Sequence, residues 1–157
     1  MTSTTTSPIK ARQLLAYGSI AALAAVAINV LIYAGGRVAD VSYVVNQTAS
    51  GPEEIRLVHV VGFCLQAFAV GLVAALVANR LGRPSLRSLQ ILGAVIAVGS
   101  TVMDVGIDSA LPAKLLLASM HIVTGVAYVA AVQVVRSRAS LATEHAPATA
   151  SRLPVAA

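Results

Sequence analysis

The sequence predicts an all-α, polytopic membrane protein with four transmembrane helices in an antiparallel bundle and both termini in the cytoplasm. Three observations predict this class. Of the 157 residues, 57% are hydrophobic and only 11% are charged, about half the charged share of an ordinary soluble domain. The hydrophobic residues gather in four runs, each close to the roughly 20 residues that a helix needs to cross a bilayer. The basic residues gather in alternate connections between these runs.

The four runs predict helices at about 14–34, 57–78, 89–107 and 113–135. Each run is about twice the length of an outer-membrane strand and is apolar on nearly all sides. In lipid a helix satisfies its own backbone hydrogen bonds, so helices are the expected solution. The first run is too long for the apolar region of a signal peptide, which has about 7–15 residues. We expect a transmembrane domain at 13–136 between disordered tails at 1–12 and 137–157.

The connections between the predicted helices differ in length and character. The first is long, and the β-branched residues at 38–47, VADVSYVVNQ, predict an extended stretch on the outer surface. Residues 50–54, SGPEE, predict a turn that leads into the next helix. The second connection, at 79–88, is short and basic, and the third, at 108–112, is a tight outer turn.

The charge distribution predicts the orientation. With the N-terminus inside, eight Lys and Arg residues would be cytoplasmic and three would be outside, and five of the six acidic residues would be outside. The positive-inside rule therefore places both termini in the cytoplasm. This orientation accounts for the net charge of +5, so no nucleic-acid partner is needed. We expect a plasma-membrane protein whose partners are the lipid bilayer and either another membrane protein or further copies of itself.

Small and polar residues interrupt each apolar run, and we expect them to face one another inside the bundle. Most of the larger polar groups fall in one layer near the outer face, and one glutamine lies nearer the midplane. These candidate site residues are Asn29, His59, Gln66, Asp104 and His121. An ionised Asp in hydrocarbon costs at least about 2.5–3.5 kcal/mol, so Asp104 needs a partner or water. His59, His121 and Asn29 are the candidate partners.

Several interpretations of this polar layer stay open. It could be an interhelical clasp that fixes helix register, an outward-open pocket for a small ligand, or a proton relay. Two His and one Asp could also bind a metal, and two His could hold haem. The histidines lack HxxxH or HxxE spacing, and their depths differ by roughly 6 Å at helical rise, which counts against haem. We therefore predict no metal, no cofactor and no catalytic residue, and we expect Cys64 to be a small packing residue.

The stretch at 108–128, DSALPAKLLLASMHIVTGVAY, resembles the last helix of a family of small actinobacterial four-helix integral membrane proteins of unknown function. That family shows an acid, a small turn, a basic residue, and a Met-His pair followed by a small-residue helix. The matching residues here are Asp108, Lys114, Met120, His121 and Gly125. The end of the first helix at 29–37, NVLIYAGGR, is similar as well, and the resemblance covers about 14–135. It implies four helices in an actinobacterial plasma membrane, and His59 matches no position of the family pattern.

The sequence contains no phosphate-binding loop, nucleophile elbow or CxxC motif, so we expect no enzymatic activity. We predict a non-enzymatic integral plasma-membrane protein that acts as an accessory or interaction subunit. The alternative is a membrane protein that binds a small ligand, a metal or a redox cofactor through the polar layer near the outer face.

Overall fold

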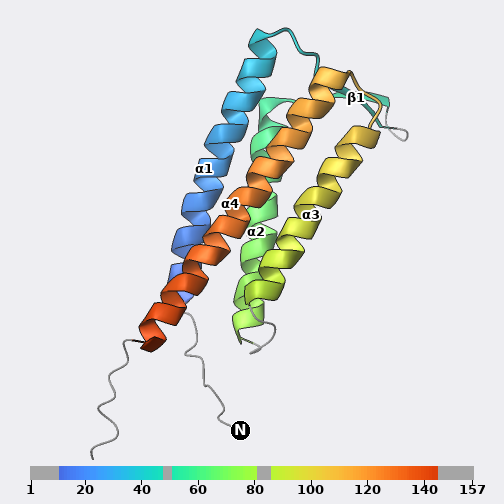
Figure 1. Ribbon diagram of the computed structural model, residues 1–157. Coiled ribbons are helices and arrows are strands. Elements are labelled where there is room, and N and C mark those ends of the chain that lie inside the picture. Colours follow the sequence, from blue (N-terminus) through green and yellow to red (C-terminus); the bar gives the residue numbers. More distant parts are fainter. Residues whose placement is uncertain (1–10, 48–50, 81–85, 145–157) are drawn as a thin grey trace, which may run out of the picture.

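The computed structural model of the chain describes residues 11–47, 51–80 and 86–144, which form four helices and a β-hairpin (Figure 1). The elements are α1 Ala11–Val38, β1 Val44–Gln47, β2 Gly51–Glu54, α2 Leu57–Arg80, α3 Leu86–Gly106 and α4 Leu111–Glu144. All four helices are long and apolar enough to cross a membrane. The predicted fold class, an all-α multi-pass membrane protein, is therefore confirmed, while its orientation stays a prediction.

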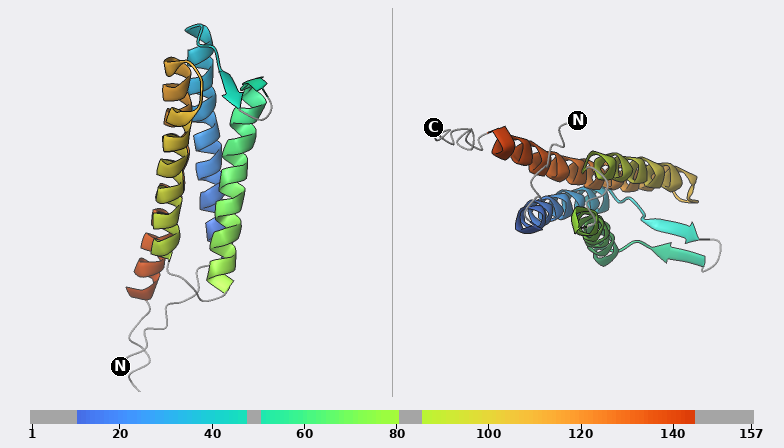
Figure 2. Two further views of the ribbon diagram at one scale, coloured as in Figure 1. Left: turned by 90° about the vertical axis from the view of Figure 1, so that its right-hand side faces the viewer. Right: turned by 90° about the horizontal axis from the view of Figure 1, so that it is seen from below.

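The helices run alternately up and down, and α1 packs against α4 in the middle of the bundle (Figures 1 and 2). α2 packs mainly on α1, and α3 packs mainly on α4, whereas α2 and α3 touch little. The spatial order is therefore α2–α1–α4–α3, and the bundle is open between α2 and α3. We call the end that carries the two strands the hairpin end.

Two of the helices extend into the predicted disordered tails. α1 begins at Ala11, inside the predicted tail 1–12, and α4 continues to Glu144. The prediction that 137–157 is disordered is therefore wrong for 137–144, because good helix formers such as Arg, Ala and Leu propagate a helix that is already nucleated. The 34 residues of α4 span about 51 Å, well beyond the hydrocarbon thickness. The rest of the predicted tails, 1–10 and 145–157, lies outside the described residues.

The first connection folds into the β-hairpin. β1 and β2 pair antiparallel, with Val44 opposite Glu54 and Gln47 opposite Gly51. The predicted extended conformation is thus seen in β1, but the predicted turn at 50–54 is wrong for the described residues, because Gly51–Glu54 forms a strand. Its backbone groups find partners in β1, a contact that the local composition of Pro and acidic residues does not reveal.

Backbone and side-chain contacts fasten the hairpin to the rest of the bundle. The Asn46 backbone N–H donates to the Asp108 carbonyl oxygen at 2.9 Å, and Asn46 Nδ2 donates to Asp108 Oδ2 at 3.0 Å. Next to the hairpin, the ring of Tyr43 is fully buried and stacks on Tyr33 with 4.8 Å between the ring centroids. The hairpin therefore joins α1 to the α3–α4 turn across the end of the bundle.

The buried faces of the helices agree with the predicted stripes in α1 but not in α2. The predicted stripe of α1 is buried at Gly18, Ala22, Ala25 and Asn29, and its last member, Tyr33, is half-buried. In α2 the prediction is wrong, because Gln66 is exposed. The buried face of α2 is instead made by Val60, Cys64, Phe68 and Ala75. Since α2 is apolar all round, the fit of side-chain shapes against α1 and α4 selects its inward face.

Candidate functional site

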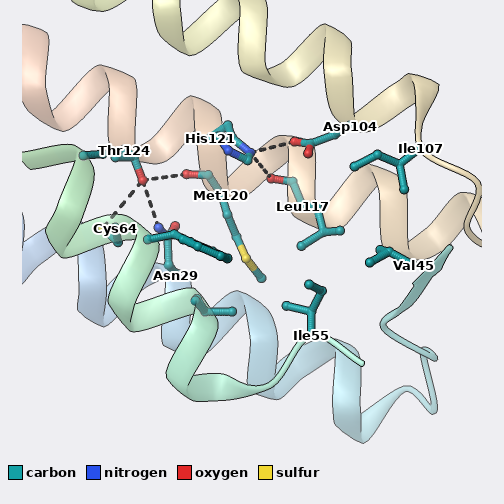
Figure 3. Close-up of a pocket in the computed structure, with 13 residues that line it drawn as sticks. Asn29, Val45, Ile55, Cys64, Asp104, Ile107, Leu117, Met120, His121 and Thr124 are labelled. Atoms are coloured by element: carbon teal, nitrogen blue, oxygen red, sulfur yellow. Dashed lines mark hydrogen bonds and ion pairs between the residues drawn. The ribbon is translucent and has the colours of Figure 1, made fainter. Parts of the chain in front are cut away.

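A pocket of about 270 Å³ lies beside the hairpin, among residues of all four helices (Figure 3). Three of the predicted site residues line it: Asn29 from α1, Asp104 from α3 and His121 from α4. The rest of its wall is mostly apolar and includes Val45 of β1, Ile55, Val60 and Met120. We call this cavity the hairpin pocket. Such a cavity, apolar with a few convergent polar groups, is typical of a small-molecule site, although it is at the small end of the usual range.

The first polar group of the pocket is a cluster around Thr124 (Figure 3). Thr124 Oγ1 donates to the Met120 carbonyl oxygen at 2.9 Å and accepts from Asn29 Nδ2 at 3.0 Å. Cys64 Sγ lies 3.7 Å from the same oxygen. Because a hydroxyl has one proton and Thr124 gives it to Met120, the Cys64 thiol is the donor in this contact.

This arrangement also orients the Asn29 carboxamide. Its NH₂ group must face Thr124, because the only proton of that hydroxyl is already used. The Asn29 side chain is almost fully buried, yet its carbonyl oxygen Oδ1 has no hydrogen-bond partner. The pocket therefore contains a buried acceptor without a donor.

The second polar group is the pair formed by Asp104 and His121. Asp104 Oδ2 lies 2.6 Å from His121 Nδ1, and the same nitrogen lies 3.1 Å from the Leu117 carbonyl oxygen. Asp104 Oδ2 makes this close ion-pair contact with His121 and has no other polar partner among the described residues. The side chain of Asp104 is only 9% exposed, whereas that of His121 is 43% exposed. The carboxylate is thus held inside the pocket wall with acceptor capacity unused.

His59 and Gln66 do not join this site. His59 Nδ1 accepts the backbone N–H of Arg56 at 3.3 Å. Arg56 immediately precedes α2, so His59 caps the start of the helix from the N3 position, as the Glu or Gln of a capping box does. Gln66 is exposed and lines a different cavity. Of the five predicted site residues, the structure therefore brings together Asn29, Asp104 and His121 and leaves the other two apart.

The separation of the two histidines argues against a metal or haem site that both would share. His59 does not line the pocket that His121 lines, so the two imidazoles do not face a common centre there. Among the described residues, no group of three or more His, Cys, Asp or Glu side chains is placed to hold a metal ion.

Thr124 is the residue of this cluster that the sequence interpretation left out of the candidate site. It links α4 to α1 through Asn29 and to α2 through Cys64. The signal was its position three residues after His121, which places both side chains on one face of a helix.

A second cavity of about 440 Å³ lies between α2 and α3. Its walls are largely apolar and include Val70 and Ala74 of α2 and Leu92 of α3, and Tyr128 of α4 lines it as well. We call it the α2–α3 groove. It occupies the open side of the bundle.

Comparison with known protein families gives one match. A family model described as a family of unknown function (DUF6069) matches residues 9–138. The chain belongs to this family. The match includes α1, the hairpin, α2, α3 and most of α4, which confirms the resemblance to a family of unknown function, while the actinobacterial source stays an expectation. No curated protein and no solved structure matches the chain.

Proposed function

We propose that this member of the family is a non-enzymatic plasma-membrane protein that binds a small hydrogen-bond-donating molecule in the hairpin pocket. The observation that carries the proposal is that Asn29 Oδ1 is buried without a hydrogen-bond partner, in the same pocket wall as the carboxylate of Asp104, which is paired with His121. Both residues line the same pocket. A buried acceptor left unpaired costs about 1–3 kcal/mol, and a ligand that donates hydrogen bonds would recover this cost.

The proposed orientation follows from the charges and puts the pocket within reach of the outside. The basic residues favour cytoplasmic termini, and the hairpin end is the end opposite α1's start and α4's finish. The hairpin pocket would then lie near the outer face of the membrane.

A purely structural clasp makes a different prediction for Asn29. In a clasp, Asn29 stabilises the fold, so that Asn29→Leu should lower the free energy of unfolding. In a binding pocket the substitution removes one hydrogen bond to Thr124, worth about 1 kcal/mol, and also removes an unpaired oxygen that costs about 1–3 kcal/mol. We therefore expect the leucine variant to be at least as stable as the wild type, in the absence of ligand.

Ligand-observed NMR on the detergent-solubilised full chain tests the proposal. The ligands are hexylamine and hexan-1-ol, which donate hydrogen bonds, and dipropyl ether, which only accepts them. We expect the two donors to bind the wild type and Asn29→Leu to lose this preference. Thr101→Val is the matched control, because the Thr101 hydroxyl bonds to Ala97 in its own helix and Thr101 does not line the pocket. Equal binding of donors and ether to the wild type, or a strongly destabilised leucine variant, would favour the clasp.

The interaction-subunit interpretation is supported by a separate observation on α3. Only 6% of the α3 span is buried inside the chain, against 22–28% for the other three spans. An apolar helix this exposed can be covered by lipid, by another membrane protein or by a second copy. The mass of the detergent-solubilised protein from light scattering distinguishes a homo-oligomer from a single chain, and a single chain would leave lipid or a different partner as the cover.

A further inference from the structure

The hairpin pocket and the α2–α3 groove adjoin each other. Four residues line both cavities: Phe63, Ala67, His121 and Thr124. His121 forms the ion pair with Asp104, and Thr124 accepts the hydrogen bond from Asn29. The polar groups of the pocket therefore lie at the boundary with the groove rather than at a remote end.

The two cavities differ in chemistry. The unpartnered oxygen of Asn29 and the His121-paired carboxylate of Asp104 belong to the hairpin pocket, and neither residue lines the groove. The groove presents mainly hydrocarbon, and the hydroxyl of Ser100 on its wall already donates to the Ile96 carbonyl oxygen at 2.6 Å. One compartment therefore requires hydrogen-bond donors, while the other favours an alkyl chain.

The groove is built into the packing of the helices. Tyr128 of α4 lies between Gly71 of α2 and Gly93 of α3, and a Cβ on either glycine would collide with the Tyr128 ring. The edge of the ring also packs against Phe68, with 6.3 Å between the centroids. Tyr128 thus acts as a spacer that fills the base of the gap between α2 and α3. The remaining space, about 440 Å³, stays open along the membrane-spanning part of the bundle.

We propose that the ligand is a single-chain amphiphile whose hydrogen-bond-donating head, an amine or a hydroxyl, lies in the hairpin pocket and whose alkyl tail lies in the α2–α3 groove. This inference rests on the proposed function of the pocket and adds the ligand class and its position. Because the groove lies in apolar spans, the tail enters from lipid without crossing water. Lipid tails are as apolar as the groove wall, so the tail contributes little hydrophobic driving force. The head selects the ligand, and the groove fixes where the tail lies.

The position of the tail is therefore the quantity to measure. We would use dodecylamine with a photoreactive diazirine at the end of its chain, bound to the full chain in lipid nanodiscs, and map cross-linked residues by mass spectrometry. We expect cross-links to concentrate on groove residues such as Val70, Ala74 and Leu92, and a tenfold excess of unlabelled dodecylamine to reduce them by most of their yield.

A matched pair of variants on α2 provides the control. Ala74 is exposed and lines the groove, whereas Ala69 is also exposed but lines neither cavity. Ala74→Phe should fill the groove and lower the cross-linking yield at least about fivefold, while Ala69→Phe should leave it unchanged. Binding of hexylamine, which has half the chain length of dodecylamine, should be the same in both variants.

The outcomes separate the two proposals. Two results would overturn the amphiphile inference while hexylamine binding still supports the pocket proposal. In the first, the diazirine labels all lipid-facing helices alike. In the second, the cross-linking yield is the same in Ala74→Phe and Ala69→Phe. If neither amine binds, the pocket proposal fails and the inference fails with it. If light scattering shows a dimer and the groove of the wild type takes up no label, a second copy occupies the groove. This result also overturns the inference.

Discussion

Replacing Gly125 with alanine should push α3 and α4 apart, because a Cβ at this position would overlap the Cβ of Ala97. Gly125 lies within α4 and Ala97 within α3, so the two helices meet closely at this point of the groove wall. Overpacking a close contact costs about 1–3 kcal/mol. Alanine is the better helix former by about 1 kcal/mol or less, which acts in the opposite direction. We therefore expect Gly125→Ala to lose up to about 2 kcal/mol of unfolding free energy overall.

Gly99 provides a matched control for the helix-propensity part. It also lies within a helix, but a Cβ there would meet nothing within 4 Å. Gly99→Ala should therefore be neutral or slightly stabilising. The difference between the two glycine variants isolates the overpacking and should be about 1–3 kcal/mol. The assay is reversible unfolding in mixed micelles with increasing SDS, followed by far-UV circular dichroism.

A compensating substitution tests the contact itself. Ala97→Gly removes the methyl group that Gly125→Ala would strike, so the double variant moves one methyl across the interface and leaves helix propensity unchanged. Its stability should return to within about 0.5 kcal/mol of the wild type, and the two changes should couple favourably. Strictly additive effects of the two substitutions would refute the close α3–α4 contact.

Three further predictions concern the site and the hairpin. Asp104→Asn replaces a charged contact with a neutral one and should lower the free energy of unfolding by about 1–2 kcal/mol. A double-mutant cycle with His121→Gln should show a coupling energy above about 0.5 kcal/mol. Additive losses would mean that His121 is not the partner of Asp104. Burial raises the pKa of the Tyr43 hydroxyl above its ordinary value, so the stability it contributes is present below about pH 10 and is lost as the pH rises through the folded pKa. Tyr43→Phe should therefore flatten the alkaline fall in unfolding free energy, and an unchanged slope would contradict the burial effect. Asn46→Cys on a Cys64→Ala background should react with a membrane-impermeant maleimide in intact cells, and labelling only after permeabilisation would reverse the proposed orientation.

The helices and the stripe of α1 could be predicted because their signals are local. Long apolar runs require helices in lipid, and Asn29 stands out as a large polar residue among small ones at helical spacing. The buried face of α2 could not be predicted from such local signals. Phe68 and Val60 are buried while chemically similar residues beside them are exposed, so the inward face depends on the shapes of the neighbouring helices.

The contacts of the site were less predictable because they join distant parts of the chain. Asp104 had several candidate partners at one depth, and only the packing of α3 on α4 selects His121. His59 looked equally suitable, but its position three residues after Arg56 gives it a local partner at the start of α2. The hairpin depends likewise on pairing between segments, which Pro52 and the two acids after it do not reveal.

The central packing of the first helix on the last has a consequence for chain connectivity. α1 and α4 lie side by side, and α1 begins at the same end of the bundle at which α4 finishes, while α2 and α3 touch little. The covalent link between α2 and α3 therefore joins two elements that contribute little packing to each other. A circular permutant that starts at α3 and joins α4 to α1 by a flexible linker would keep every helix in its original direction across the bilayer, and the fold should tolerate it.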